Sequence, residues 1–155
     1  MTKQISFDAI DLRILRLLQD DSSLSVAEIG ERIGLSQTPC WKRLKRLEAC
    51  GVIKKRVALL DRAMLGVGFT VFVTVRTNRH DPEWLSAFAK GASALPEVVE
   101  LWRLSGERDY LLKVVVSDIT AYDAFYKRLI AVAPLADVSS SFAMEEIKAT
   151  TAAPF

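Results

Sequence analysis

The residues best suited to chemistry in this sequence are four basic side chains within five positions, Lys42, Arg43, Lys45 and Arg46. They lie in the segment "SQTPCWKRLKRLEACG" (36–51), between a Pro-Cys-Trp and a Leu-Glu. Lysine and arginine bind phosphate groups, because both donate hydrogen bonds and both neutralise negative charge. The whole chain of 155 residues has a net charge of only +2, so the cluster is a local concentration of charge.

The residues around the cluster predict a helix with two different sides. At about 100° per residue, Cys40, Leu44 and Leu47 fall on one side, and Lys42 and Lys45 fall on the other. The apolar side is expected to pack against neighbouring elements while the basic side faces outward. A basic helix face is often only solvated surface, so the surrounding elements must decide between the two interpretations.

Two more helices and a β-rich segment are expected around this helix. Residues 7–21 carry apolar side chains at helical spacing, which predicts a first helix. Ser25 and Glu28 form the Ser-x-x-Glu capping box that begins a second helix, and Gly34 is suited to end it. Ser36 then caps the third helix, and the β-rich residues after it supply a wing. This order indicates a winged helix-turn-helix.

In a helix-turn-helix, the N-terminal end of the third helix enters the major groove of DNA. Short polar side chains there contact base edges, and positive charges bind phosphates. Gln37 and Thr38 are therefore expected to contact bases, Trp41 to pack on a thymine methyl or on the backbone, and the basic run 54–56 to extend the positive surface. The predicted DNA-binding residues are Ser36, Gln37, Thr38, Trp41, Lys42, Arg43, Lys45, Arg46, Lys54, Lys55 and Arg56.

The second half of the chain differs from the first in charge and in pattern. Residues 1–60 carry eleven Lys/Arg against seven Asp/Glu, whereas residues 61–155 carry ten against twelve. Such an asymmetry suggests two modules with different partners. The order of expected elements is β-α-β-β-α-β, a ferredoxin-like α+β fold with both helices on one face of the sheet. The expected strands are 69–77, 98–105, 110–117 and 138–148, and the expected helices are 81–95 and 118–133.

One face of that sheet would remain uncovered, although Phe72, Trp102 and Leu104 lie on its strands. An exposed apolar surface usually marks a contact with a partner. A homodimer is therefore expected.

Several classes of protein are excluded by the composition. No apolar run is long enough to span a bilayer and no signal-peptide pattern is present, so a soluble cytoplasmic protein is expected. Cys40 and Cys50 would be separated by roughly 15 Å along one helix, too far for a disulfide. With His80 as the single histidine, no zinc-ligand spacing exists. We find no catalytic set, P-loop or dinucleotide motif, so neither a metal, a cofactor nor enzyme activity is expected.

Three segments resemble a known family, the Lrp/AsnC or feast/famine transcriptional regulators. The string "TPCWKRLKRLE" is similar to that family's "S-x-T-P-x-x-x-R-x-x-x-L-E" recognition helix. "SGERDYLLK" resembles its "G-D/E-x-D-Y" effector loop, and "FAMEEIK" its closing strand. The resemblance covers residues 8 to 148. Within the family, the chain most resembles a subgroup that includes cysteine-responsive activators of cysteine-degrading enzymes.

The resemblance implies an organisation and a mode of control. It implies a winged helix-turn-helix domain at 1–56, a linker strand at 57–65, a ferredoxin-like effector-binding and oligomerisation domain at 66–150, and a tail at 151–155. Members of the family pair into dimers through their sheets and often form octamers. Small effectors, usually amino acids, bind at contacts between dimers and change DNA binding or oligomeric state.

The effector region can also be interpreted from its residues. Asp109 can accept hydrogen bonds from an ammonium group, and backbone amides around Gly106 can donate to a carboxylate. Trp102 would form a wall of the pocket. An alternative interpretation is a plain hairpin turn in which Asp109 caps backbone amides. Arg108 departs from the family's usual Tyr or Phe, which puts the shape of the pocket in question. The predicted effector-binding residues are Trp102, Ser105, Gly106, Glu107, Arg108, Asp109, Tyr110, Ser139, Ser140 and Ser141.

Two functional hypotheses therefore remain open. The first is a sequence-specific transcriptional regulator of amino-acid metabolism that is controlled by an amino-acid effector. The second is an architectural protein that wraps DNA and has no effector. The sequence does not identify the effector, although cysteine is one candidate, and it does not distinguish a dimer from an octamer.

Overall fold

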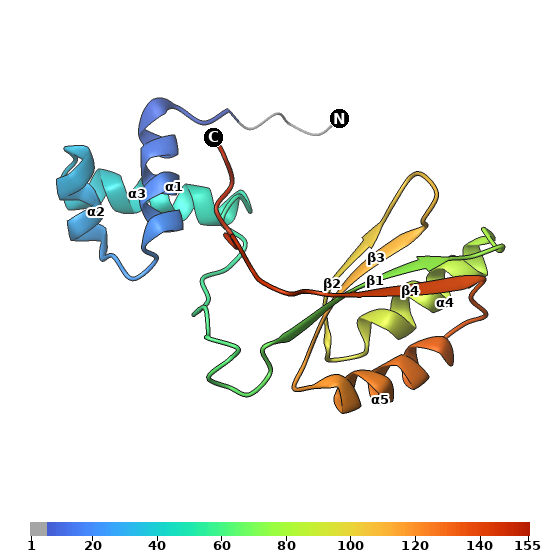
Figure 1. The fold of residues 1–155 in the computed structure, drawn as a ribbon. Helices are drawn as coiled ribbons and strands as arrows, with labels where there is room; N and C mark the ends of the chain where they lie inside the picture. Colours follow the sequence, from blue (N-terminus) through green and yellow to red (C-terminus); the bar gives the residue numbers. More distant parts are fainter. Residues whose placement is uncertain (1–5) are drawn as a thin grey trace. The chain divides into compact units, whose positions relative to one another are not determined.

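The computed structural model describes residues 6–155, which divide into two compact units (Figure 1). The first unit contains the described residues up to Leu59 together with the final segment Lys148–Phe155. The second unit contains Leu60–Ile147. Among residues 6–155, no helix is both long and apolar enough to cross a membrane.

The first unit contains the three expected helices, α1 (Ala9–Asp20), α2 (Val26–Ile33) and α3 (Gln37–Ala49). The predicted capping box of α2 is present, since the Ser25 hydroxyl accepts the Glu28 amide and the Glu28 carboxylate accepts the Ser25 amide. Gly34 ends α2 with a φ of 76°, a left-handed conformation that suits glycine. Ser36 occupies the N-cap position of α3, but its side chain makes no capping hydrogen bond.

The three helices enclose a small apolar core. The expected buried side of α3 is confirmed, because Cys40, Leu44 and Leu47 all lie inside. They pack with Ile14 of α1 and Ile29 of α2 in one cluster of buried side chains. The burial of apolar surface at these positions stabilises the arrangement of the three helices.

The final segment of the chain returns to α1. The Ala153 amide donates to Gln19 Oε1 at 2.6 Å, and Gln19 Nε2 donates to the Ala153 carbonyl at 3.3 Å. Arg16 Nε donates to the Phe155 carbonyl at 3.1 Å, and its guanidinium carbon lies 5.5 Å from the centre of the Phe155 ring. We expected a domain at 66–150 and a tail at 151–155, whereas in the structure residues 148–155 belong to the first unit.

We expected a β-rich wing and a linker strand at 57–65 after α3. Between α3 and the next strand, residues 50–68 contain only turns and irregular backbone. The Asp61 carboxylate accepts the amides of Ala63 and Met64, which forms a turn instead. A strand requires a neighbouring strand as the partner for its backbone hydrogen bonds, and no strand of the described chain pairs with this stretch.

The second unit has the expected β-α-β-β-α-β order. Its elements are β1 (Phe69–Arg76), α4 (Pro82–Ser93), β2 (Val98–Arg103), β3 (Tyr110–Val116), α5 (Ile119–Ile130) and β4 (Asp137–Phe142). All strand pairs are antiparallel, in the order β2-β3-β1-β4, and both helices cover the same face of the sheet (Figure 1). The strand expected at 138–148 ends at Phe142.

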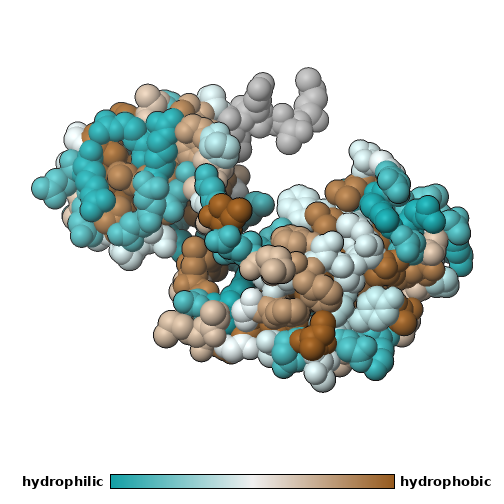
Figure 2. Space-filling model, viewed as in Figure 1, coloured by the Kyte–Doolittle hydropathy of each residue, from teal (hydrophilic) through white to brown (hydrophobic). Residues whose placement is uncertain are grey.

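The sheet separates a buried face from an open one. Along β1, Val71, Val73 and Val75 are fully buried against the helices, where they join Phe88 of α4 and Phe125 of α5. The side chains between these valines point to the other face, which neither helix of this unit covers. That open face carries Phe72, which is 38% exposed, and Trp102, which is 57% exposed. Brown hydrophobic patches interrupt the teal surface of this unit in Figure 2.

Candidate DNA interface and effector region

The N-terminal part of α3 presents polar side chains to solvent. Ser36, Gln37 and Thr38 are all exposed, and Trp41 on the next turn is 49% exposed. Because Ser36 makes no capping bond, its hydroxyl is available to an outside partner. These four predicted DNA-binding residues therefore lie on one exposed surface at the end of α3 that a helix-turn-helix places in the major groove.

The arginines of α3 are bound within the unit. Arg43 Nη1 donates to Asp8 Oδ2 at 2.7 Å and to Asp11 Oδ1 at 2.9 Å. Arg46 Nη2 donates to Asp11 Oδ2. Asp8 and Asp11 are the capping box of α1, and the Asp11 side chain is only 1% exposed. We expected Arg43 and Arg46 to contact DNA, but in the structure both are partners of these carboxylates.

The charges in this cluster stabilise one another. Burial raises the pKa of Asp11, but hydrogen bonds from Arg46, the Asp8 amide and Arg43 outweigh burial and leave the pKa below its ordinary value. The Asp11 amide and the Arg43 side chain lower the pKa of Asp8. The pKa values of Arg43 and Arg46 are raised, chiefly by the carboxylates that accept their hydrogen bonds. All four groups therefore carry charge at neutral pH, and the cluster as a whole is neutral.

Two further arginines of this unit also donate to internal acceptors. Arg13 donates to the carbonyl of Arg32 at 3.0 Å and to that of Ile33 at 3.4 Å, at the C-terminal end of α2. Arg56 donates to the Ser22 carbonyl at 3.3 Å and to Glu48 at 3.4 Å. The bonds to Arg32, Ile33 and Ser22 satisfy carbonyl groups at a helix end or in a loop.

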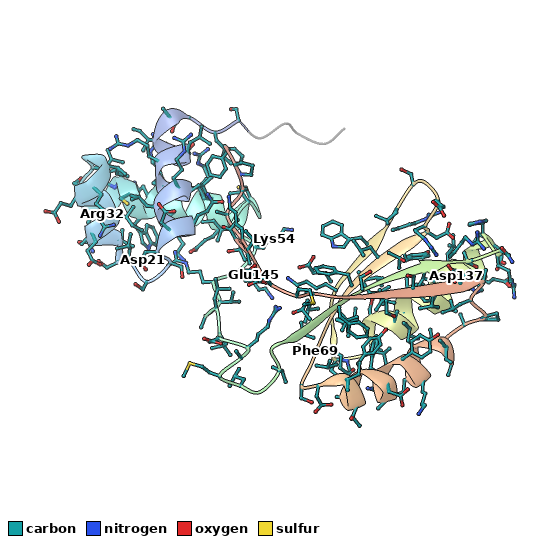
Figure 3. All side chains as sticks on the ribbon, viewed as in Figure 1. Asp21, Arg32, Lys54, Phe69, Asp137 and Glu145 are labelled. Atoms are coloured by element: carbon teal, nitrogen blue, oxygen red, sulfur yellow. The ribbon has the colours of Figure 1, made fainter. Side chains whose placement is uncertain are left out.

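The lysines are different. Within residues 6–155, Lys42, Lys54 and Lys55 form no ion pair and no side-chain hydrogen bond, and all three are exposed (Lys54 is labelled in Figure 3). Lys45 lies 2.8 Å from Glu48, but the Lys45 side chain is 55% exposed, and an ion pair at the surface contributes little. The free positive charge on α3 and on the segment that follows it is therefore carried mainly by lysine.

Sequence reasoning missed Asp8 and Asp11 as partners of α3. The sequence did contain a signal. The two acidic residues 8 and 11 are three positions apart, as are the two basic residues 43 and 46, and residues at this spacing lie on the same side of a helix. The spacing alone does not show that α1 packs against α3. That packing brings together groups that are 32 and 35 positions apart in the chain.

The predicted effector loop joins β2 to β3 and is held in place by its own polar groups. Asp109 Oδ2 accepts the Thr77 amide at 2.8 Å, and the Asp109 amide donates to the Val75 carbonyl at 2.9 Å. Asp109 therefore caps a backbone amide, as the alternative interpretation expected, and only Oδ1 remains for another group, at 4.0 Å from His80 Nδ1. Gly106 adopts a φ of 138°, which few other residues tolerate.

Arg108, the residue that departs from the family pattern, forms an ion pair with Asp137 at the beginning of β4. This ion pair connects the β2–β3 loop to the edge strand. The Arg108 side chain lowers the pKa of Asp137, so the pair is charged at neutral pH. Ser105 and Glu107 of the same loop are exposed, whereas Tyr110 is buried in the core beside Phe88.

The remaining predicted effector residues do not gather at one place. Ser139 and Ser141 pair with Thr74 and Phe72 and point to the open face of the sheet. Ser140 points to the opposite face, where its hydroxyl hydrogen-bonds that of Tyr122. β2, which carries Trp102, is the other edge strand of the sheet. Within a single chain, these residues therefore do not line a common pocket.

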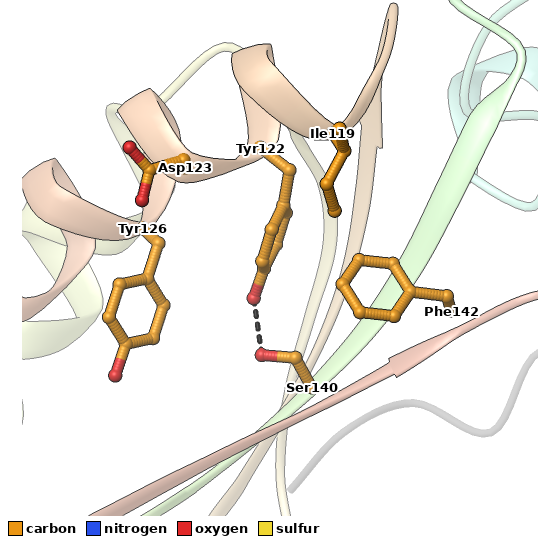
Figure 4. A pocket seen from close by; sticks show the side chains of 6 residues that line it. All are labelled: Ile119, Tyr122, Asp123, Tyr126, Ser140 and Phe142. Carbon is orange, nitrogen blue, oxygen red and sulfur yellow. Dashed lines mark hydrogen bonds between the residues drawn. The ribbon is translucent and has the colours of Figure 1, made fainter.

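The structure contains a shallow pocket elsewhere, between α5 and β4 (Figure 4). Its volume is about 310 Å³, and Ser140 is the only predicted effector residue in its lining. In Figure 4 the Tyr122 hydroxyl points to Ser140, and the Phe142 ring lies beside Ile119. The pocket is lined by Ile119, Tyr122, Asp123, Tyr126, Ser140 and Phe142.

Taken together, the two units define a class of protein, a helix-turn-helix module joined to a separate α/β module. Residues 7–54 match the family model described as winged helix-turn-helix DNA-binding. Residues 70–153 match the model described as Lrp/AsnC ligand binding domain. The chain belongs to the Lrp/AsnC family of DNA-binding transcriptional regulators.

Similar proteins cover nearly the whole chain. The DNA-binding transcriptional activator DecR of Escherichia coli K12 is 50% identical over 148 residues, which are 95% of this chain and 97% of that protein. An AsnC family regulator from Agrobacterium tumefaciens has a crystal structure with a TM-score of 0.93 and 55% identity, covering 96% and 97% of the two chains. The regulator NMB0573 of Neisseria meningitidis, solved as a complex with L-Met, has a TM-score of 0.91 and 35% identity, covering 96% and 97% of the two chains.

Proposed function

We propose that this protein binds specific DNA sequences through Ser36, Gln37, Thr38 and Trp41, while Lys42, Lys45, Lys54 and Lys55 bind phosphates. The observation that supports the proposal most directly is the exposed polar end of α3, which is followed on the next turn by Lys42, a lysine with no ion pair or side-chain hydrogen bond among residues 6–155. Short polar side chains distinguish bases in the major groove, whereas lysines supply affinity that does not depend on sequence.

The test is a binding titration with Lys42→Ala combined with Lys45→Ala, on a duplex selected by the wild-type protein from a random pool. We expect a large loss of affinity, because two positive charges leave the phosphate-binding surface. The matched control combines Lys90→Ala with Lys127→Ala, which removes the same charge from the second unit. Equal affinity of both double variants would contradict the assignment of α3 as the DNA-binding helix.

We further propose that a free amino acid controls DNA binding. The family resemblance implies that effectors bind at contacts between copies of the chain. This agrees with the structure of a single chain, in which the predicted effector residues do not lie together. The related regulator NMB0573 was solved with L-Met, which supports an amino acid as the class of ligand. In this chain, Asp109 Oδ1 would accept the ammonium group and the amides around Gly106 would bind the carboxylate.

A thermal-shift screen of the twenty amino acids, cysteine and methionine included, tests this second proposal. A binding amino acid should raise the melting temperature of the wild-type protein. The rise should be smaller for Asp109→Asn than for Glu83→Gln, which removes the same charge from an exposed position on α4 of the same unit, outside the predicted effector residues. If no amino acid raises the melting temperature or changes DNA binding, the architectural alternative is favoured.

We also propose that two copies pair through the open face of the sheet and that such dimers assemble further, up to an octamer. The exposed Phe72 and Trp102 on that face support pairing, because burying them removes apolar surface from water. The number of dimers in the assembly is taken from the family resemblance.

A further inference from the structure

Asp11 is a charged residue in an unusual environment. It lies on α1, its side chain is 1% exposed, and charged residues are almost never buried so completely unless they are paired. Its carboxylate accepts three donors, Arg43 on Oδ1 and both Arg46 and the Asp8 amide on Oδ2. The hydrogen bond from the Asp8 amide fixes the orientation of the Asp11 carboxylate. The directions from which this carboxylate can accept hydrogen bonds from the two arginines are therefore fixed as well.

Both arginines come from α3 and are separated by nearly one helical turn. The apolar contacts of Cys40, Leu44 and Leu47 press α3 against the other helices, but apolar contacts have no preferred direction. Two hydrogen-bonded anchors on one carboxylate are directional, and together they restrict both the rotation of α3 about its axis and its movement along that axis.

The magnitude of this restriction matters for base contacts. Side chains of a helix extend roughly 5–6 Å from its axis, so a rotation of about 20° moves their ends by about 2 Å. Hydrogen bonds to base edges tolerate only a few tenths of an ångström around their usual length. A small rotation of α3 would therefore displace Gln37 and Thr38 from their bases, while flexible lysines would still reach phosphates.

We propose that Asp11 is a positioning residue for sequence recognition: through Arg43 and Arg46 it sets the rotation of α3 and so aligns Gln37, Thr38 and Trp41 with the bases. The inference rests on the proposed function and adds to it a residue that does not touch DNA. A buried ion pair is weak evidence for stability alone, so orientation is the role that its geometry supports.

The experiment compares Asp11→Asn with Asp20→Asn in the full chain. Both remove one negative charge from α1, but Asp20 is exposed and has no hydrogen bond or ion pair with α3 in the described structure. Affinity is measured on a duplex selected by the wild-type protein and on a scrambled duplex of the same composition. We expect Asp11→Asn to lower the ratio of the two affinities about tenfold or more, the loss of one good base contact. Asp20→Asn should leave the ratio unchanged.

A second variant, Arg46→Gln, keeps the test decisive if Asp11→Asn does not fold. Arg46 is 50% exposed, so a simple phosphate contact is the competing role. Loss of a phosphate contact weakens binding to both duplexes equally and leaves the ratio intact, whereas loss of positioning lowers the ratio. An unchanged ratio in folded Asp11→Asn, or in Arg46→Gln, overturns the proposal.

Amide hydrogen exchange separates this inference from the proposed function. If the wild-type protein selects no sequence from the pool, the proposed function fails, but the role of Asp11 is still measurable without DNA. Folded Asp11→Asn should exchange faster than wild type in α3 and at an unchanged rate in α2. Equal exchange in α3 for both proteins would overturn the positioning role.

Discussion

Arginine and lysine have different tasks in the first unit. Arg13, Arg43, Arg46 and Arg56 donate to carbonyl or carboxylate groups of the protein, whereas Lys42 has no such partner in the described chain. Arginine suits the internal role because its guanidinium is planar, always charged and able to bind two acceptors at once. Lysine suits the outer role because it acts as a flexible point charge.

Replacing Lys42 and Arg43 one at a time should show this difference. Lys42→Ala is expected to reduce the slope of log affinity against log salt by about one, with unchanged thermal stability, because one phosphate contact is lost. Arg43→Ala is expected to lower the free energy of unfolding by about 1–3 kcal/mol, because it leaves Asp8 without a charged donor and leaves Asp11 with Arg46 as its one charged donor. Salt titrations and urea unfolding measure the two effects. If both variants changed the salt slope and the free energy of unfolding to the same extent, the proposed difference in role between Lys42 and Arg43 would be contradicted.

The acidic residues of the cluster also predict how stability depends on pH. The pKa values of Asp8 and Asp11 are lowered in the folded protein, so the unfolded chain binds protons more readily than the folded one. Their stabilising contribution is complete above the unfolded value of about 3.9 and is lost as the pH falls through the folded values. Urea unfolding of wild type and Asp11→Asn between pH 7 and pH 3 checks this. The decline in stability on acidification should be smaller in the variant, and equal declines would contradict the prediction.

At the scale of elements, the caps of α2 and α3 provide a matched comparison. Ser25 makes the capping hydrogen bonds of α2, whereas Ser36 has the same position in α3 without a capping bond. Ser25→Ala should therefore lower the free energy of unfolding by about 1 kcal/mol. Ser36→Ala should change it by less than about 0.5 kcal/mol but weaken DNA binding. Chemical unfolding and binding titrations of both variants are the measurements; equal stability losses would show that Ser36 also caps its helix.

Local patterns predicted most of the elements, because helices and their caps depend on residues close together in the chain. The apolar spacing of Cys40, Leu44 and Leu47 identified the buried side of α3. The linker strand at 57–65 stays a prediction, because strand formation requires a pairing partner that the segment itself does not contain. In the effector region, the alternation of sides along a strand already separates Ser140 from Ser139 and Ser141. The role of Asp11 required the packing of two helices, which no single segment encodes.

At the scale of the whole molecule, the open face of the sheet can be tested by placing a negative charge on it and measuring the size of the assembly. Phe72→Glu should prevent the proposed pairing of two copies, because it would bury a carboxylate without a partner. Ile130→Glu is the control, since Ile130 is similarly exposed but lies on α5, on the covered side of the sheet. Analytical ultracentrifugation should show a smaller assembly for Phe72→Glu and the wild-type mass for the control. An unchanged mass for Phe72→Glu would exclude this face as the dimer contact.

The return of residues 148–155 to α1 has a consequence for hybrids between relatives. The chain passes from the first unit to the second near Leu59 and passes back near Ile147. A chimaera that takes its DNA-binding half from one regulator and its effector half from another therefore needs two junctions. A single junction near residue 60 would combine Arg16 and Gln19 of one parent with the closing segment of the other, and the contacts of Ala153 and Phe155 would survive only if both parents share them.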